Sequence, residues 1–337
     1  MAQRVLFFDL LRCVAALAVV LIHALGPYRH LIGEIPLADW SIAVGLNSMS
    51  RWAVPVFIMI TGALLLSDRR RFQPALFFNK RFAKVLLPFL AWSVFYAYLS
   101  GWSATGFEWS VASQVIADFF SHHTYYHLGF FYYFLPLYFL IPVYRWFIVE
   151  HGRAGLHAFL IVWLLTASLY LLRVDGPWSN SIWLYSGFLM LGYYLYQELP
   201  VNRRGVLIAT CLGGSALLGT IVMVISSSIE NGEYTVGRWL SYKTINTVLA
   251  ATMVFVWCRY YAERISSRAM RVVTFISRYS LGIYLLHPLF LWPLYQLDWP
   301  LMHPLLGLPI WIAVSGGLAL ALSWVLAKYR FSAWLVP

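Results

Sequence analysis

Charged side chains are scarce in this chain, and their scarcity excludes a water-soluble globular protein. Asp, Glu, Lys and Arg together make up 11% of its 337 residues, while 61% are hydrophobic and 18% are aromatic. Soluble domains carry about 25% charged residues. Apolar runs long enough to cross a bilayer, which takes about 20 residues, recur from one end of the chain to the other. The sequence predicts an all-α, polytopic membrane bundle that forms a single domain over residues 1–337.

Cysteines are few in this chain, and nucleotide-binding motifs are absent from it. The three cysteines, Cys13, Cys211 and Cys258, have no paired spacing, so neither a disulfide framework nor a zinc site is implied. No G-x-G-x-x-G or Walker element is present, which leaves ATP chemistry and a nucleotide redox cofactor without support. The small-residue pattern at 16–18 is followed by more apolar residues, so the first run is expected to be an uncleaved helix rather than a signal peptide.

The apolar runs predict about ten transmembrane helices. They cover roughly 5–26, 52–67, 82–100, 126–147, 156–172, 181–198, 205–226, 240–258, 280–297 and 307–327. Two longer connections, 26–51 and 101–125, contain Trp40, Trp102 and Trp109, and these tryptophans are expected at the membrane surface.

Basic residues between these helices predict the topology. With the N-terminus inside, the outer segments hold five: Arg29, Arg51, Arg173, Arg238 and Lys243. The inner segments hold eighteen: Arg4, Arg69, Arg70, Arg71, Lys80, Arg81, Lys84, Arg145, Arg153, Arg203, Arg204, Arg259, Arg264, Arg268, Arg271, Arg278, Lys328 and Arg330. Basic residues prefer the cytoplasmic side of a membrane. We therefore expect both termini to be cytoplasmic.

Two ionisable residues inside the first helix are the strongest functional signal. Arg12 and His23 are eleven residues apart, which on a helix puts both side chains on one face, separated by about 16 Å along the axis. Asp9 precedes Arg12 by three residues and is placed to pair with it. A snorkelling arginine and an interfacial histidine would be the structural explanation. Their alignment, and the cost of ionisable groups in a membrane, favour a functional site made of Asp9, Arg12 and His23.

These residues carry a family resemblance. The chain resembles membrane acyltransferase family 3, the O-acyltransferases of bacterial surface glycans, whose signature is an Arg, ten residues and a His in the first helix. Four later stretches resemble the family in order: NSMSRWAVPVFIMITG from Asn47, KRFAKVLLP from Lys80, YHLGFFYYFLPLY from Tyr126 and ISRYSLGIYLLHPLF from Ile276. Gly129 stands where the family usually has Trp.

Three further residues are expected to contact the acceptor substrate. Arg51 precedes Pro55 near the depth of His23, and it is either a membrane-boundary residue or part of the site. His127 belongs to a cluster with His122 and His123, where the i, i+4 spacing of 123 and 127 suits a metal but a third ligand is missing, so no metal is expected. His287 lies beside Pro288 inside the ninth helix, either as a hydrogen-bonding group of the bundle or as part of the same cavity.

The basic stretch 69–84 has two explanations. The positive-inside rule accounts for several basic residues, and phosphate recognition accounts for Lys80, Arg81 and Lys84 at a helix start. The resemblance implies cytoplasmic acetyl-CoA as the acyl donor, and we expect these three residues to bind it. Attack of a hydroxyl on a thioester needs a base, for which His23 is the candidate.

The resulting expectation is an O-acetyltransferase of the bacterial cytoplasmic (inner) membrane. Its partners would be the acyl-CoA donor, membrane lipid and a glycan acceptor, either a polysaccharide or a lipid-linked oligosaccharide, and not nucleic acid. The alternative is a membrane transporter or exporter of a glycan or a small solute, which intramembrane charges also fit. Transporters often have two similar halves, and the Arg and His of the first helix have no counterpart in the sixth.

Overall fold

The structure, a computed structural model that describes residues 5–297 and 301–337, is helical almost throughout. Helices account for 76% of the chain. The only strands among the described residues are β1 (Trp102–Ser103) and β2 (Gly106–Phe107), a two-stranded antiparallel ribbon in which Trp102 pairs with Phe107. The prediction of an all-α class is confirmed. Arg4, counted above among the inner charges, lies outside the described residues.

The chain divides into two compact units, residues 1–69 with 137–277 and residues 70–136 with 278–337. Unit 1 contains α1 (Leu6–Ala24), α2 (Leu37–Ser50), α3 (Ala53–Leu66), most of α7 (Gly129–Leu171), the 3-10 turn η2 (Pro177–Ser179), α8 (Ser181–Gln197), α9 (Arg203–Asn231), α10 (Ile245–Tyr261), the 3-10 turn η3 (Ala262–Arg264) and α11 (Ser267–Arg278). Unit 2 contains α4 (Pro74–Arg81), the π-helical turn η1 (Phe82–Leu86), α5 (Leu87–Ser100), the ribbon, α6 (Trp109–Ala117), α12 (Ser280–Gln296), α13 (Pro304–Leu326) and the 3-10 turn η4 (Ala333–Leu335). The single-domain interpretation stays a prediction.

Six helical stretches are long and apolar enough to span a membrane. They are Leu6–Ala24, Leu37–Leu66, Pro74–Ser100, Gly129–Leu171, Arg203–Asn231 and Pro304–Leu326, as found in the described part of the chain. Three other predicted spans coincide with α8, α10 and α12, of 17 residues each. Two predicted spans, 126–147 and 156–172, fall on α7, which is kinked at Gly152 (φ 56°, ψ −149°). The count of ten spans stays a prediction.

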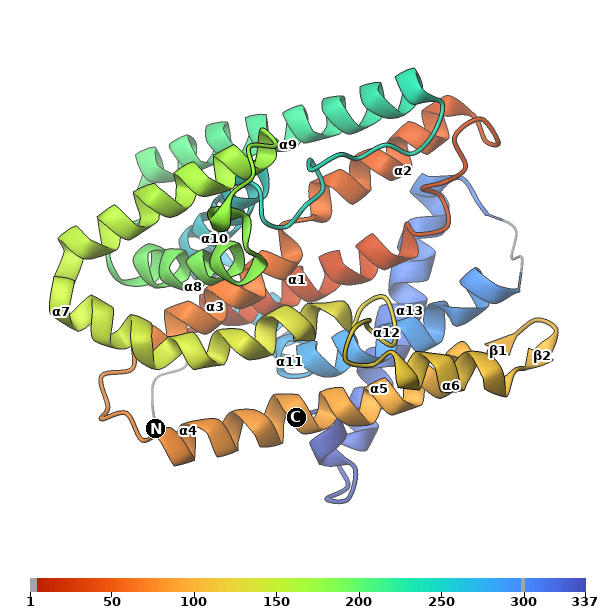
Figure 1. The fold of residues 1–337 in the computed structure, drawn as a ribbon, viewed down its shortest axis with the longest axis horizontal. Coiled ribbons are helices and arrows are strands. Elements are labelled where there is room, and N and C mark those ends of the chain that lie inside the picture. The colour runs from red at the N-terminus through yellow and green to blue at the C-terminus, as the bar shows by residue number, and fades with distance from the viewer. Residues whose placement is uncertain (1–4, 298–300) are drawn as a thin grey trace. The chain divides into compact units, whose positions relative to one another are not determined.

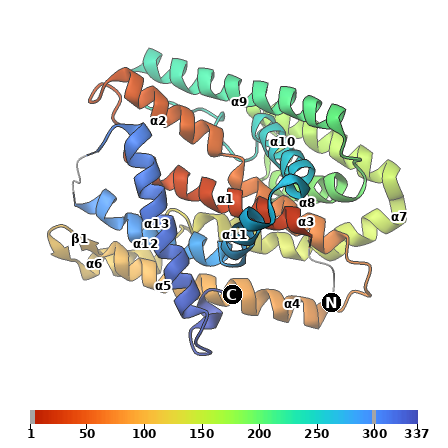
Figure 2. The ribbon, with the colours of Figure 1, turned by 180° about the vertical axis from the view of Figure 1, so that it is seen from behind.

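The centre of unit 1 is built from α1, α3, α8 and α10, whose contacts Figures 1 and 2 show from opposite sides. Backbones of α3 and α8 touch at two glycines. A Cβ on Gly62 would lie 2.0 Å from the Leu189 carbonyl oxygen, and a Cβ on Gly192 would lie 2.0 Å from the Met59 carbonyl oxygen. Small residues allow this approach, which maximises van der Waals contact between membrane helices. Of this pair, α3 is the helix on which α1 packs.

Burial separates the inner helix α1 from the outer helix α9. In the most apolar window of each helix, 61% of α1 is buried but only 22% of α9. Figure 1 draws α9 alongside α2, with which it is in contact. Without a hydrophobic driving force among lipid tails, an apolar exposed helix surface is compatible with lipid contact. The helix that bears Arg12 and His23 is therefore interior to its unit, whereas α9 is peripheral.

Trp40 is not at a surface, which corrects one expectation. Its side chain is fully buried among Val44, Val224 and Leu240, and its indole nitrogen donates to the Arg29 carbonyl at 3.0 Å. Trp102 and Trp109 are exposed, and their position at a membrane surface stays a prediction. The amphipathic ring of Trp suits an interface, but in this segment α2 packs on α9 and the ring becomes core.

In unit 2, α12 continues through two prolines. Pro288 and Pro293 lie inside the helix, and α13 packs along it. A proline lacks the N–H that would bind the carbonyl four residues earlier, here that of Tyr284. The Tyr96 hydroxyl of α5 donates to the next carbonyl, that of Leu285, at 2.6 Å. Side chains from a neighbouring helix thus support the backbone of α12 close to the proline.

Candidate functional site

The first part of the site lies near the start of α1 and contains Asp9 and Arg12. Their closest charged atoms, Asp9 Oδ1 and Arg12 Nη1, are 3.8 Å apart, and the Asp9 side chain is 4% exposed against 32% for Arg12. Ser277 of α11 donates a hydrogen bond to the same Asp9 oxygen at 2.7 Å. The predicted pairing of Asp9 with Arg12 is present. The carboxylate is held from both sides, so it can orient a guanidinium that remains partly open to a ligand.

His23 lies on the last turn of α1, and Arg29 stabilises the backbone beside it. The Arg29 Nη2 group donates to the Ile22 carbonyl at 2.5 Å, while the His23 carbonyl accepts the Gly26 N–H at 2.9 Å. Carbonyls at the end of a helix need such donors, and a cation there is favoured by the helix dipole. Because α1 is uninterrupted from Leu6 to Ala24, Arg12 and His23 belong to one continuous rod of about three turns.

Arg29 continues into a polar network with α2 and the segment after α9. Its Nη2 lies 3.5 Å from the Asn47 side-chain oxygen, and the Asn47 amide donates to the Tyr234 hydroxyl at 3.2 Å. Asn47 is fully buried. Burial raises the pKa of Tyr234, and the positive charges of Arg29 and Arg51 oppose that rise. Two guanidinium groups therefore act on one tyrosine within this network.

Arg51, at the end of α2, binds the segment between α9 and α10. Its Nε donates to the Leu240 carbonyl at 3.2 Å, its Nη1 to the Tyr242 hydroxyl at 3.0 Å, and the guanidinium lies 4.9 Å from the centre of the Tyr242 ring. All described hydrogen-bond partners of Arg29 and Arg51 are neutral oxygens. Their positive charge is thus available to an oxygen-rich or anionic group of a substrate.

A second cluster, in unit 2, surrounds His127 with aromatic rings. The imidazole is 2% exposed, and its ring centre lies 4.7 Å from that of Tyr96, 5.7 Å from that of Tyr284 and 5.8 Å from that of His287. The Tyr284 hydroxyl donates to the His127 carbonyl, which fixes the turn before α7. His127 and His287 thus lie side by side in this unit, while a shared substrate cavity stays a prediction.

Both ring nitrogens of His127 are buried without a hydrogen-bond partner among the described residues. The Leu285 carbonyl, which accepts the Tyr96 hydroxyl, is close enough to act on the ring, but its geometry is not that of a hydrogen bond to either imidazole nitrogen. Buried polar groups are nearly always paired, and leaving one unpaired costs about 1–3 kcal/mol. This makes His127 the clearest candidate in unit 2 for a group that binds a ligand.

His287 has a structural task of its own. It is fully buried, and its Nδ1 lies 2.9 Å from the Ile283 carbonyl oxygen, one turn earlier on α12. A carbonyl can only accept, so this contact requires the proton on Nδ1. The imidazole therefore supports the backbone next to Pro288, the structural explanation that the sequence left open, and it also faces His127.

The neighbouring histidines show no metal arrangement. His122 is exposed and lies 3.2 Å from the Ser121 hydroxyl, and within the described residues no group of three His, Cys, Asp or Glu side chains is placed to hold a metal. Gly129 opens α7, where an added Cβ would be 3.4 Å from the His123 ring. An added Cβ would therefore be in ordinary van der Waals contact with this ring.

The predicted donor-binding residues lie on one short helix and the turn after it. Lys80 and Lys84 are exposed, and the Arg81 guanidinium lies 5.5 Å from the centre of the Phe77 ring. These three residues belong to unit 2, as do His127 and His287. Asp9, Arg12, His23 and Arg51 belong to unit 1. Joint action of these groups on one donor stays a prediction.

Four residues of the site were missed by sequence reasoning. Arg29 had been counted only as a topological charge, and Asn47, Tyr234 and Ser277 carried no motif of their own. Asn47 opens the stretch that resembles the family's second-helix element, and Ser277 lies in the stretch that resembles the penultimate one. Those two stretches were signals for Asn47 and Ser277. The partner of Asn47 is Tyr234 and the partner of Ser277 is Asp9, and because both are far away in sequence they could be found only from the fold.

Comparison with known proteins agrees with this geometry. The family described as acyltransferase domain matches residues 5–328, which includes nearly the whole chain and parts of both units. No curated protein and no solved structure matches the chain. A match of this extent, together with the membrane-spanning helices, favours acyl transfer over transport. The chain belongs to the family of membrane acyltransferases defined by this domain.

Proposed function

We propose that the protein is an integral membrane O-acetyltransferase of the bacterial cytoplasmic membrane. It moves an acetyl group from cytoplasmic acetyl-CoA to a sugar hydroxyl of a cell-surface or lipid-linked polysaccharide on the extracytoplasmic side. The observation that carries the proposal is the single rod α1, with Arg12 oriented by Asp9 toward one end and His23 beside the Arg29 network at the other. Membership of the acyltransferase family supports the reaction class.

His23 is proposed as the general base. It takes the proton of the acceptor hydroxyl while the hydroxyl oxygen bonds to the acetyl carbonyl carbon. The carbon–sulfur bond then breaks, and the coenzyme A thiolate leaves and is protonated. A histidine is suited to this task near neutral pH, and general base catalysis contributes on the order of 10²–10⁴ in rate.

Arg12 is proposed to hold the donor. The rise of about 16 Å between Arg12 and His23 is comparable to an extended pantetheine arm, so a donor anchored at Arg12 can bring its acetyl group to His23. Lys80, Arg81 and Lys84 are proposed to bind its phosphates, because clustered cations recognise phosphate groups. Asp9 acts as a positioning residue for Arg12.

The acceptor is proposed to contact Arg29 and Arg51 of unit 1, and the expectation that His127 also contacts it stays a separate prediction. Sugar hydroxyls and glycan phosphates present the oxygen atoms that guanidinium groups bind. We propose that the chain is similar to the O-acetyltransferase of enterobacterial common antigen in length and in its motif stretches, and that its acceptor is a polysaccharide or a lipid-linked oligosaccharide.

The test is acetyl transfer from labelled acetyl-CoA to isolated glycan by purified full-length protein. His23→Ala is expected to lower kcat by about 10²–10⁴ with the donor KM unchanged. Arg12→Ala is expected to raise the donor KM, because it removes a charge–phosphate contact. His157→Ala, an exposed histidine of α7, is the matched control and is expected to retain full activity.

Two outcomes would contradict the proposal. Undiminished transfer by correctly inserted His23→Ala would show that His23 is not the general base. Consumption of acetyl-CoA without any acetylated glycan would show that the acceptor is not a glycan. Labelled acetyl retained on the protein after incubation with the donor alone would replace direct transfer by an acetyl-enzyme.

A further inference from the structure

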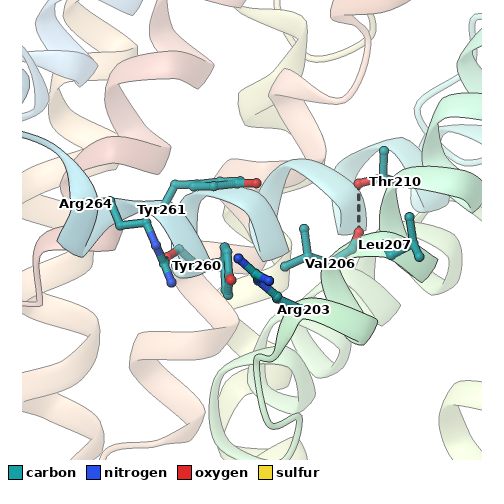
Figure 3. Close-up of a pocket in the computed structure, with 7 residues that line it drawn as sticks. All are labelled: Arg203, Val206, Leu207, Thr210, Tyr260, Tyr261 and Arg264. Carbon is teal, nitrogen blue, oxygen red and sulfur yellow. Dashed lines mark hydrogen bonds between the residues drawn. The ribbon is translucent and has the colours of Figure 1, made fainter.

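A pocket between the start of α9 and the end of α10 lies outside the site described above. It has a volume of about 500 Å³ and is lined by Arg203, Val206, Leu207, Thr210, Tyr260, Tyr261 and Arg264. Figure 3 shows these side chains, with Tyr260 drawn between the guanidinium groups of Arg203 and Arg264. All of the lining residues belong to unit 1.

The two arginines give the pocket uncompensated positive charge. The Arg264 guanidinium lies 3.9 Å from the centre of the Tyr260 ring and donates to the Tyr260 carbonyl, so it is held in place by α10. Arg203 makes no hydrogen bond or ion pair with a described residue, and no described acid pairs with Arg264. Two planar guanidinium groups on one pocket, one of them held by α10 and the other exposed, suit a pair of phosphate oxygens.

The α9 side of the pocket carries its aliphatic residues. Val206 and Leu207 line its α9 side, and the Thr210 hydroxyl is already engaged, donating to the Val206 carbonyl at 2.7 Å and accepting from the Trp257 indole at 2.8 Å. Leu207 is 63% exposed on the outward surface of α9, the least buried of the six candidate spans. The pocket therefore joins a cationic end to an apolar helix surface that faces out of the protein.

A ligand that fits both parts carries an anionic phosphate and a hydrocarbon chain. Basic pockets between membrane helices bind anionic lipid headgroups, and tyrosines are enriched at the depth of those headgroups. A soluble phosphate or nucleotide would use the arginines but leave the exposed apolar surface unused. We propose that this pocket binds an anionic phospholipid, with its phosphate at Arg203 and Arg264 and an acyl chain along Val206 and Leu207.

Native mass spectrometry of the full-length protein in detergent tests the proposal. The probes are phosphatidylglycerol and phosphatidylcholine with identical acyl chains, added to the wild type and to Arg203→Gln. We expect phosphatidylglycerol to bind more tightly than phosphatidylcholine. Arg203→Gln should weaken phosphatidylglycerol binding about fivefold, since one basic residue near an anionic lipid contributes about 1 kcal/mol. The matched control is Arg204→Gln, because Arg204 is an equally exposed neighbour that does not line the pocket.

Three results would overturn the proposal. They are equal binding of the two lipids, equal loss in Arg203→Gln and Arg204→Gln, and displacement of phosphatidylglycerol by millimolar inorganic phosphate or adenosine 3′,5′-bisphosphate. The last result would mean that the pocket serves a soluble phosphate compound. None of these readouts depends on acyl transfer, so the lipid site and the proposed enzyme activity fail or succeed separately.

Discussion

At the scale of single residues, the unpaired imidazole of His127 is the most unusual group in unit 2. It lies in a shell of tyrosine rings, where a hydrocarbon ring would bury as much surface without leaving two nitrogens unsatisfied. A protein keeps such a group at a cost in stability, and functional sites are where that cost is expected.

Replacement of His127 by Phe separates the effect of the imidazole on stability from its effect on activity. We expect the variant to be as stable as the wild type or up to about 1–3 kcal/mol more stable, because the unpaired nitrogens are removed. Acetyl transfer is expected to fall in the same variant. Thermal unfolding in detergent and the transfer assay measure the two effects, and His157→Phe is the control at an exposed histidine. A large loss of stability in His127→Phe would mean that the nitrogens have partners in the folded protein.

For the site on α1, the sequence predicted local geometry better than the long-range partners of each residue. The spacing of Arg12 and His23 on one helix, and the pairing of Asp9 with Arg12, follow from helix periodicity and hold in the structure. Arg29 escaped attention because a basic residue outside an apolar run has a sufficient explanation in topology. Its contact with the Ile22 carbonyl depends on the turn after α1, which periodicity does not describe.

At the scale of elements, the contact between α3 and α8 depends on the absence of side chains at Gly62 and Gly192. Gly192→Ala is expected to destabilise the protein by about 1–3 kcal/mol, because its Cβ would lie 2.0 Å from the Met59 carbonyl oxygen and the helices would have to separate. Gly214→Ala in α9 is the control. No heavy atom lies within 4 Å of its added Cβ, so a gain of up to about 1 kcal/mol in helix propensity is expected. Thermal unfolding of the two variants makes the comparison, and equal stabilities would contradict the close packing.

The loops after α7 and α9 are joined by Arg238 and Asp175, and this joint is expected to respond to acid. Both Arg238 nitrogens bind the carboxylate, at 2.9 and 2.6 Å, and these hydrogen bonds lower the pKa of Asp175 below its usual value. The stability that the pair adds is present above the unfolded-state pKa of about 3.9 and is lost as the pH falls through the lowered value. It does not change between pH 5 and pH 8.

Comparison of the wild type with Asp175→Asn measures this effect. The wild type is expected to unfold at a higher temperature above about pH 4, and the difference should vanish at lower pH. Asp118→Asn is a matched control, because the Asp118 carboxylate accepts from the neutral Gln114 amide. A difference that persists at low pH would show that the charge of Asp175 is not its cause.

Element boundaries were predictable where apolar runs end at polar residues, and less so elsewhere. The predicted span 181–198 corresponds to α8, and 280–297 corresponds to α12, even though two prolines lie inside it. α2 lies in a segment where no span was predicted, because its polar residues, such as Asn47 and Ser48, interrupt the apolar pattern. Those residues are buried by α9 and its following segment, a long-range contact that hides the polarity from solvent and makes Trp40 part of the core.

At the scale of the whole molecule, the asymmetry of basic residues predicts on which side of the membrane each helix end lies. The class of the fold followed directly from the scarcity of charge, whereas the division into two compact units had no signal in the sequence. The boundary at 69–70 falls in the basic stretch between two apolar runs, but such stretches also separate helices within one unit, and the boundary at 136–137 falls inside the continuous helix α7.

Labelling of α9 tests the predicted orientation. In a Cys211→Ala background, Arg204→Cys and Asn231→Cys place exposed thiols at the two ends of this helix, while Cys13 and Cys258 are buried. A membrane-impermeant maleimide is expected to label Asn231→Cys in intact cells and Arg204→Cys only after permeabilisation. Lys328→Cys should behave like Arg204→Cys, because the positive-inside rule places the C-terminus in the cytoplasm. The reverse pattern would contradict the topology.

On the proposed mechanism, the attachments at both ends of α1 also limit which acyl donors the protein can use. Ser277 holds Asp9 near one end, and Arg29 holds the Ile22 carbonyl near the other. The distance between Arg12 and His23 is therefore fixed by the helix. On the proposed mechanism, a thioester whose arm is shorter than pantetheine would leave its acyl carbon short of the imidazole. The length of α1 between Arg12 and His23, rather than a binding pocket for the acyl group, would then decide which donors are accepted.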